Sequence, residues 1–316
     1  MNSNKFLKPC PICGGSQVCN ERVLNEIELL RCQPCGFVYA NLTEEQITLQ
    51  NSEFGESVAV SYEESQTLVD KLWFKIIVQK ITSRIKTGSV LDVGCGNGVL
   101  LKNFLDKGWK ASGVDLSPWA QKSAQLYGYK LYTCELEKSQ LPDNSFDVVV
   151  STSTLEHIPQ PYLHVKEILR VVKPGGLAYF SGIPNYGSLP IRLKISDFRC
   201  NQPPNHSNYF TYGSMRKLFS SPQIADKVKT ACIVTYGIPG LHKLYGFLRN
   251  AVPKTAKSSK QTANAKNASS NNKPQLQQTS KSSLSITVAK ILIALYYHLG
   301  RFLHLGDKLE VMVIKR

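Results

Sequence analysis

Three glycines and two acids with the potential to bind a ligand stand close together in the first half of the chain. Residues 90–98 read VLDVGCGNG, so Asp92 is followed by Gly94, Gly96 and Gly98 at alternate positions. Glycine tolerates a positive φ and lets a ligand touch the backbone, which suits an adenosine-bearing molecule. The spacing differs from the G-x-G-x-x-G pattern of dinucleotide-binding proteins and from the GxxxxGK[ST] phosphate loop. Taken alone, the glycines are also compatible with a tight turn that binds nothing.

A second acid supports the ligand interpretation. Asp115 stands in the segment GVDLS, about 20 residues after the glycines. A carboxylate at this distance can accept hydrogen bonds from both hydroxyls of a ribose. The same acid would favour the start of the following helix through the helix dipole, and the two roles are compatible.

Four of the nine cysteines form two pairs with the spacing of a metal site. Cys10 and Cys13 are followed, after 18 further residues, by Cys32 and Cys35. This spacing is typical of a zinc ribbon, and we expect a structural Zn²⁺ site with four thiolate ligands rather than a redox-active pair. The other cysteines have no partner in the sequence and are expected to be buried thiols: Cys19, Cys95, Cys134, Cys200 and Cys232.

Alternating strands and helices must position these residues. Strands are predicted at residues 89–93, 110–114, 130–132, 146–150, 177–183, 231–236 and 309–314. Helices are predicted at residues 68–81, 99–107, 118–128, 162–172 and 214–219. This rhythm predicts an α/β fold with a doubly wound, mostly parallel sheet that helices cover on both faces.

The order of the motifs resembles that of class I S-adenosylmethionine-dependent methyltransferases. The matching segments are VLDVGCGNG, GVDLS, LPDNSFDVVVSTSTLEHIPQP, ILRVVKPGGLAYFSGIPN and, for the last strand, LGDKLEVMVIKR. The resemblance implies a seven-stranded sheet with an antiparallel last strand, and S-adenosylmethionine as cofactor. It implies these cofactor-binding residues: Asp92, Gly94, Gly96 and Gly98 at the methionine end, Asp115 with Leu116 at the ribose, Glu135 and Leu136 at the adenine, and Ser151 and Thr152 beneath the sulfonium.

Two histidines are candidates for a catalytic base. In the methyl transfer that the resemblance implies, the cofactor supplies the reactivity, and the protein supplies position, a dry cavity and in some cases a base. His157 in LEHIPQP and His206 in PPNHSNYFTYGSM could deprotonate a hydroxyl. His157 could instead cap or pack beneath the cofactor, and His206 could only hold its loop. Tyr209 and Tyr212 are expected to be packing residues.

A zinc ribbon ahead of such a domain is similar to two groups of methyltransferases. One group acts on small molecules and sugars of bacterial surface-polysaccharide and secondary-metabolite pathways, and the other acts on ribosomal RNA. The segments CGFVYAN and HSNYFTYGSM look closer to the first group. Between the cysteine pairs, acids accompany the arginines and leave no basic face for RNA: Glu21, Glu26, Glu28, Arg22 and Arg31. We therefore expect O-methylation of a small-molecule or saccharide acceptor, with RNA methylation and non-catalytic cofactor binding as alternatives.

Composition is consistent with one large domain and a small module. The chain has 316 residues, 42% of them hydrophobic, and a net charge of +15, which favours anionic partners. Six lysines and no acids lie in the low-complexity stretch 253–283, which is expected to be disordered. The remaining basic residues are spread along the chain, so no single block predicts a nucleic-acid-binding arm.

The predicted organisation has five parts: a zinc ribbon at 1–40, a connecting helical segment at 41–85, the methyltransferase core at 86–252, the disordered insert at 253–283, and a C-terminal helix with the final strand at 284–316. Basic residues interrupt the apolar stretch 284–305, which is too short to span a bilayer. We expect a buried or lid helix there, with peripheral membrane contact as the alternative. No secretory signal or disulfide framework is apparent, so a cytoplasmic protein is expected, while its oligomeric state is not predicted.

Overall fold

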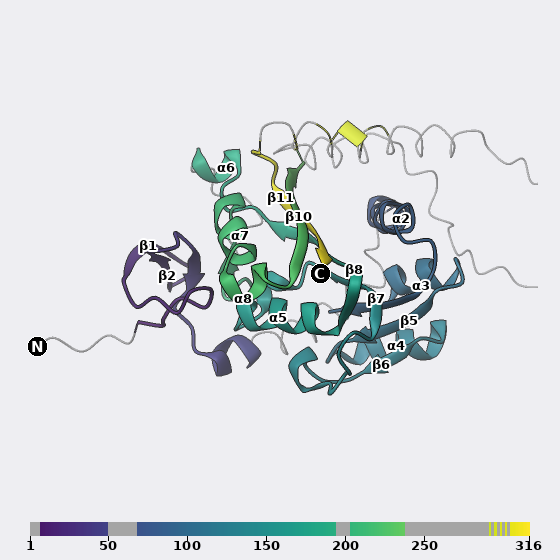
Figure 1. Ribbon diagram of the computed structural model, residues 1–316. Coiled ribbons are helices and arrows are strands. Elements are labelled where there is room, and N and C mark those ends of the chain that lie inside the picture. The colour runs from purple at the N-terminus through teal and green to yellow at the C-terminus, as the bar shows by residue number, and fades with distance from the viewer. Residues whose placement is uncertain are drawn as a thin grey trace, which may run out of the picture.

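A seven-stranded sheet forms the centre of the computed structural model, which describes residues 7–49, 68–193, 203–237, 291, 294–295, 298, 301 and 304–316. The strand order is β10-β11-β8-β7-β4-β5-β6 (Figure 1). The strands are β4 Ser89–Val93, β5 Lys110–Val114, β6 Lys130–Tyr132, β7 Phe146–Thr152, β8 Val172–Pro184, β10 Val228–Tyr236 and β11 Lys308–Lys315. Neighbouring strands from β8 to β6 are parallel, while β11 runs antiparallel between β8 and β10. The predicted sheet with an antiparallel last strand is confirmed.

Helices cover both faces of this sheet. They are α2 Leu68–Thr82, α3 Val99–Leu105, α4 Pro118–Tyr127, α5 Pro161–Val171, α7 Tyr212–Phe219 and α8 Pro222–Ala225. The short helix α6 Leu189–Arg192 places Ile191 in a separate apolar cluster with Leu29 and Val38, and two short 3-10 helices are η1 Leu136–Lys138 and η2 Leu155–His157. Leu91 and Val149 join the apolar cluster of α5, α7 and α8, whereas Val90 and Val148 join that of α2, α3 and α4. Successive strand side chains point to opposite faces, so each central strand contributes to both clusters.

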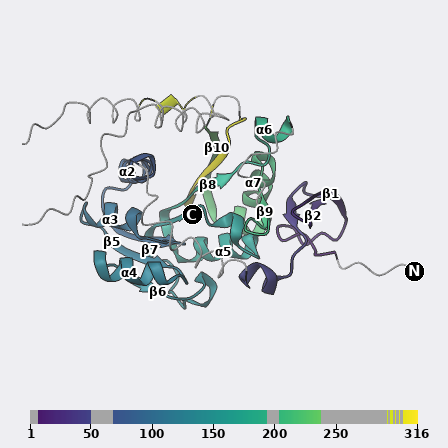
Figure 2. The same ribbon diagram turned by 180° about the vertical axis from the view of Figure 1, so that it is seen from behind.

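A second sheet contains the N-terminal residues. Its order is β1-β2-β3-β9, with β1 Val18–Leu24, β2 Ile27–Cys32, β3 Val38–Ala40 and β9 Asn208–Tyr209. We call residues 7–40, which contain the first three strands, the cysteine module. The fourth strand comes from the loop that follows β8, and Figure 2 shows it between α7 and the strands β1 and β2. The predicted ribbon is therefore completed by a segment of the core.

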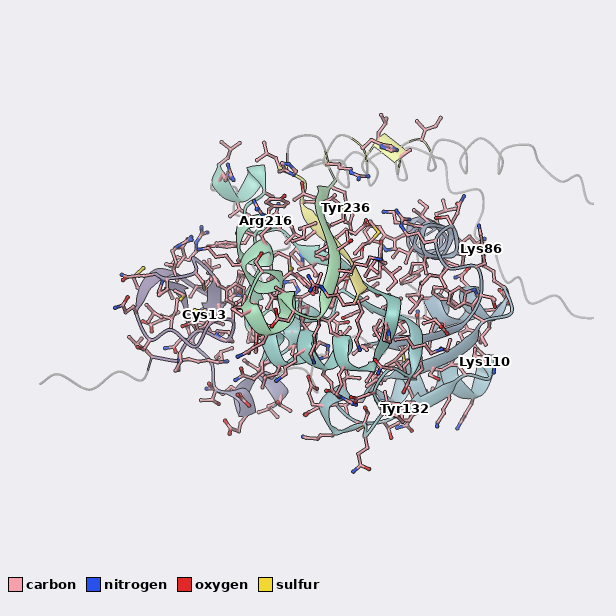
Figure 3. The ribbon with its side chains drawn as sticks, in the orientation of Figure 1. Cys13, Lys86, Lys110, Tyr132, Arg216 and Tyr236 are labelled. Atoms are coloured by element: carbon pink, nitrogen blue, oxygen red, sulfur yellow. The ribbon has the colours of Figure 1, made fainter. Side chains whose placement is uncertain are left out.

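The cysteine module also shares its apolar interior with the core. Phe37 and Tyr39 belong to the same buried cluster as Phe210 and Met215. The ring centroids of Phe37 and Phe210 are 5.0 Å apart, and burying an aromatic side chain of this size contributes about 2–3 kcal/mol. In Figure 3, Cys13 marks the module end of the molecule, far from Lys110 of the main sheet.

The expectation of a buried thiol is wrong for Cys19, which is exposed on the edge strand β1. Cys95 is buried as expected, while Cys134 and Cys232 are half-buried. Within the predicted C-terminal helix, the described residues 291, 294, 295, 298 and 301 are helical and exposed, and the expectation of a buried or lid helix stays a prediction. Cys200 and the predicted insert 253–283 lie outside the described residues. None of the described helices has the length and hydropathy needed to span a bilayer.

Candidate functional site

The glycine loop follows β4 at the carboxyl edge of the parallel strands. Gly94, Gly96 and Gly98 have φ values of 77°, 48° and 66°, a left-handed conformation that favours glycine. A Cβ atom at Gly94 would collide with Thr154 Oγ1, and one at Gly98 would lie 2.6 Å from the Tyr129 ring. A Cβ atom at Gly96 would meet nothing within 4 Å. The loop is thus closely packed at its two ends and leaves space beside its middle glycine.

Asp115, directly after β5, holds this loop. Its Oδ2 accepts a hydrogen bond from the Gly96 N–H at 2.8 Å, and its Oδ1 accepts one from the Ser117 N–H at 2.8 Å. Ser117 is the N-cap of α4, so the carboxylate joins the glycine loop to the start of that helix. Each carboxylate oxygen can accept a second hydrogen bond. The geometry therefore suits both predicted roles of Asp115, at the helix start and toward a ribose.

Two buried polar atoms at this edge have no hydrogen-bond partner among the described residues. Asp92 is 2% exposed with an unpaired Oδ1, and Ser151, near the end of β7, is 1% exposed with an unpaired Oγ. Burial, with the neighbouring charge of Asp115, raises the pKa of Asp92 to about 8. Because unpaired buried polar groups are unfavourable, these atoms indicate a ligand with polar groups. The ammonium group of a methionine moiety fits Asp92 in particular.

The other predicted cofactor residues differ in their surroundings. Leu116 is 60% exposed, whereas Leu136 is 1% exposed and belongs to the core cluster. Glu135 forms an ion pair with Lys138 at 2.9 Å near the surface, and Thr152 is the last residue of β7. Their roles at the ribose, adenine and sulfonium stay predictions.

The two predicted bases come together from distant parts of the chain. The rings of His157 and His206 have centroids 4.9 Å apart and planes at 75°. Glu156 joins them, with one carboxylate oxygen and one nitrogen of each ring within 4.8 Å of one another. His157 Nδ1 lies 2.6 Å from the carbonyl oxygen of Asn205. Because a carbonyl only accepts, Nδ1 donates, and the lone pair of the neutral ring resides on Nε2.

Burial controls the charge of this cluster. It lowers the pKa of His206 to about 3, with help from the nearby charges of His157 and Lys308. Burial also raises the pKa of Glu156, which is 2% exposed and whose Oε2 finds no partner within the part of the chain described. His206 is therefore neutral at physiological pH, and Glu156 can accept a hydrogen bond or stabilise a nearby positive charge.

The histidine cluster begins directly beside the glycine loop. Thr154 Oγ1 lies 3.2 Å from the Val93 carbonyl and 3.0 Å from the Thr152 carbonyl, so it can donate to either. The same atom occupies the space against Gly94, and the next residues form η2, which contains His157. The structure therefore brings the predicted cofactor loop and the predicted bases to one edge of the sheet.

Two further residues, Ser207 and Asn208, hold the cluster, and the sequence assigns them no role. The Ser207 N–H donates to the Glu156 carbonyl at 3.0 Å. Asn208 Nδ2 donates to the carbonyls of Ile158 at 2.6 Å and Leu155 at 3.2 Å. These bonds fix both ends of η2, and they depend on the tertiary placement of a distant loop.

The four predicted metal ligands form a second candidate site, within the cysteine module. Their Sγ atoms all lie within 4.8 Å of one another, and the separations are 3.5 Å for Cys10–Cys35 and 3.5 Å for Cys13–Cys32. A disulfide requires about 2.05 Å, whereas two thiolates on one tetrahedral zinc with Zn–S bonds of about 2.3 Å lie about 3.8 Å apart. The hydrogen bond from Cys10 lowers the pKa of the Cys35 thiol. The donor set therefore fits a structural Zn²⁺ ion.

The sheet order, the antiparallel last strand and the glycine loop after β4 define a class I S-adenosylmethionine-dependent methyltransferase fold. Residues 91–180 match the family described as "Methyltransferase domain". Residues 91–180 are thus similar in sequence to methyltransferase domains, and the sheet that contains them has the class I fold that the motifs predict.

Curated relatives match the same part of the chain. It is 37% identical over 100 residues to a "Ubiquinone biosynthesis O-methyltransferase" of Albidiferax ferrireducens, a match that covers 29% of this chain and 40% of that protein. For the protein of the same description in Thiobacillus denitrificans, the identity is 41% over 100 residues, covering 29% of this chain and 43% of that protein. The matches therefore span less than half the length of these relatives.

Solved structures share the fold over a larger part of the chain. A S-adenosylmethionine-dependent methyltransferase from Thermotoga maritima, described as a possible histamine N-methyltransferase, superposes with a TM-score of 0.52 at 15% identity, covering 84% of this chain and 100% of that one. A plantazolicin methyltransferase in complex with S-adenosylhomocysteine gives a TM-score of 0.50 at 15% identity, covering 86% and 96%. At these identities the similarity establishes the fold alone.

Proposed function

We propose that this chain is an S-adenosylmethionine-dependent methyltransferase that transfers a methyl group to an oxygen of a small-molecule or saccharide acceptor. The observation that carries the proposal is the contact of Thr154 with Gly94, which joins the cofactor loop to the turn that bears His157. A methyl donor and a base must lie this close together for transfer to a hydroxyl.

The glycine loop and its acids provide the cofactor half of the site. When bound, S-adenosylmethionine supplies a methyl group activated by a sulfonium. Asp92 would accept from its ammonium group, because this carboxylate is buried with an unpaired oxygen. Asp115 would accept from the ribose hydroxyls, and the open space at Gly96 lets the ligand approach the backbone.

The histidine cluster provides the acceptor half. His157 takes the proton of the acceptor hydroxyl at Nε2, since its Nδ1–H is held by the Asn205 carbonyl. The carboxylate of Glu156 stabilises the imidazolium that forms. His206, with its pKa lowered to about 3, remains neutral beside it and adds no competing positive charge.

Features outside the site favour a small acceptor over RNA. The charge of Arg31 on β2 is neutralised, because its guanidinium donates to both carboxylate oxygens of Glu21, at 2.6 and 2.7 Å. The curated relatives are named for O-methylation in ubiquinone biosynthesis, which supports an oxygen acceptor on a small molecule. The cysteine module would then hold a structural Zn²⁺ ion through Cys10, Cys13, Cys32 and Cys35.

Transfer of a radiolabelled methyl group tests this proposal. The purified chain is incubated with labelled S-adenosylmethionine and host extract, and the RNA, protein, glycan and small-molecule fractions are separated. We expect label in the small-molecule or glycan fraction. Label that disappears on ribonuclease treatment would replace this function with RNA methylation, and binding of the cofactor without transfer to any fraction would indicate a non-catalytic protein.

A further inference from the structure

The cysteine module and the loop that contains His206 contribute strands to one sheet. In the pairing of β3 with β9, Val38 lies opposite Tyr209 and Tyr39 opposite Asn208. The Ala40 N–H extends the pairing by donating to the Ser207 carbonyl at 2.9 Å. The backbone that directly follows His206 is therefore held by the module.

The same two residues hold the turn that bears His157. Ser207 accepts from β3 through its carbonyl and donates to the Glu156 carbonyl through its N–H at 3.0 Å. Asn208 pairs with β3 through its backbone, while its side-chain amide donates to the Ile158 carbonyl at 2.6 Å. Residues 207–208 thus form a continuous hydrogen-bonded connection from the module to the histidine cluster.

Further contacts bind the module to this region. Asn25 Nδ2 donates to the Pro203 carbonyl at 2.8 Å, which holds the chain three residues before His206. Lys217 Nζ donates to the Cys35 carbonyl at 2.9 Å, which joins α7 to the second cysteine pair. Both contacts cross from the module to the core and are independent of the β3–β9 pairing.

The proposed metal site lies immediately before β3. Cys35 is three positions ahead of Val38, and the turn between β2 and β3 is closed by bonds from the Gly36 N–H to the Cys32 carbonyl at 2.7 Å and from the Cys32 N–H to the Phe37 carbonyl at 2.9 Å. A strand of three residues has little stability of its own. A metal ion bound by Cys32 and Cys35 would therefore fix the strand that in turn holds residues 207–208.

We propose that the cysteine module is a positioning element of the transfer site, in which metal binding by its four cysteines holds His157 and His206 in place through β3, Ser207 and Asn208. This inference rests on the proposed function only for the role of the two histidines. It assigns the module to the acceptor half of the site and not to recognition of a separate partner.

Histidine side-chain NMR of the full-length chain tests this proposal directly. Imidazole ¹⁵N signals are followed through a pH titration, before and after removal of zinc with a chelator. In the loaded chain we expect His206 to be neutral at about pH 6, where an imidazole of ordinary pKa is mostly protonated and the thiolates still hold zinc, since its pKa is lowered to about 3. After zinc removal we expect its titration to move toward the ordinary value of about 6.5, together with a change in the His157 signals. His164 is an internal control, because it is buried on α5 and bonded to Glu137 at 2.8 Å.

Variants in the loaded chain separate positioning from metal loss. Asn208→Ala removes the amide that holds η2, and Asn25→Gly removes the bond to Pro203 while keeping the positive φ of 48° at this position. Both should retain zinc and shift the His157 and His206 signals, with the larger shift for Asn208→Ala. Asn20→Ala is the matched control, because its amide bonds Glu28 on β2, away from β9, and it should shift neither signal.

Affinity for S-adenosylhomocysteine, measured by calorimetry, completes the test. We expect zinc removal and Asn208→Ala to change the dissociation constant by less than about threefold, because among the described residues no hydrogen bond joins the glycine loop to the module. Unchanged histidine signals after zinc loss would overturn the inference, as would an equal loss of cofactor affinity, which would indicate a general folding role. Absence of binding to the loaded wild-type chain would instead count against the proposed function.

Discussion

The cofactor half and the histidine half of the site are assembled in different ways. Asp92, the three glycines and Asp115 lie within one strand–loop–helix–strand unit, and the bond from Gly96 to Asp115 spans only 19 positions. The histidine half joins η2 to residues 205–208, and its outer support comes from β3 near the N-terminus. The first half is therefore a local product of the sequence, and the second requires the whole fold.

This difference predicts that the two halves respond differently to the same kind of change. A substitution in the glycine loop acts on ligand contact and on adjacent packing. A substitution in the module acts at a distance, through hydrogen bonds that cross between sheets.

Loss of a metal ligand should damage the histidine half most. Cys32→Ser removes one of four thiolates, and we expect loss of zinc and a fall in melting temperature of about 10 °C. Metal analysis and thermal unfolding measure both effects. Cys19→Ser is the control, because Cys19 is exposed and outside the cluster. Equal zinc content in the two variants would show that the four cysteines do not bind the metal.

Closing the glycine loop should damage the cofactor half most. Gly94→Ala combines a strained φ of 77° with a collision at Thr154, and we expect S-adenosylhomocysteine to bind at least about 100-fold more weakly, or about 2.7 kcal/mol. Gly108→Ala has the same φ of 77° but meets open space, so it should lower stability by about 1 kcal/mol and leave affinity unchanged. Similar affinities for both variants would remove the loop from the binding site.

Asp115 should matter through its acceptor oxygens. Asp115→Ala loses the bonds to Gly96 and Ser117 and those expected to the ribose, so we expect affinity to fall by about 10- to 100-fold, since bonds to charged groups contribute about 1.5–3 kcal/mol. Asp115→Asn keeps one acceptor oxygen and should show a smaller loss. Calorimetry compares the two variants, and an unchanged Asp115→Ala affinity would exclude Asp115 from ribose binding.

The buried carboxyl of Asp92 should make cofactor binding depend on pH. Its pKa of about 8 in the free chain means that it is largely protonated at pH 6. An ammonium ligand favours the ionised form, so affinity should rise with pH up to about 8, by at most about tenfold per unit. Asp92→Asn should bind more weakly and flatten this profile. Affinity that falls as the pH rises from 6 to 8 in the wild-type chain would contradict the assignment.

The contrast between the halves also marks the limit of prediction from sequence. The alternation of strands and helices and the glycine turn after the first strand of the parallel sheet depend on local spacing, and the structure confirms them. The sequence also identifies His157 and His206, but not Glu156, Ser207 and Asn208, because their contacts join segments far apart in the chain. The module boundary near residue 40 misses β9 for the same reason.

A methyl-transfer assay tests most directly whether this chain methylates a small acceptor with His157 as base. The wild-type chain and the His157→Gln and Asp115→Ala variants are assayed side by side with labelled S-adenosylmethionine in fractionated extract. We expect the wild-type chain to label a small-molecule or glycan fraction. His157→Gln should lose transfer while binding S-adenosylhomocysteine normally, and Asp115→Ala should lose binding. Transfer that survives His157→Gln, or label that resides in RNA, would contradict the account.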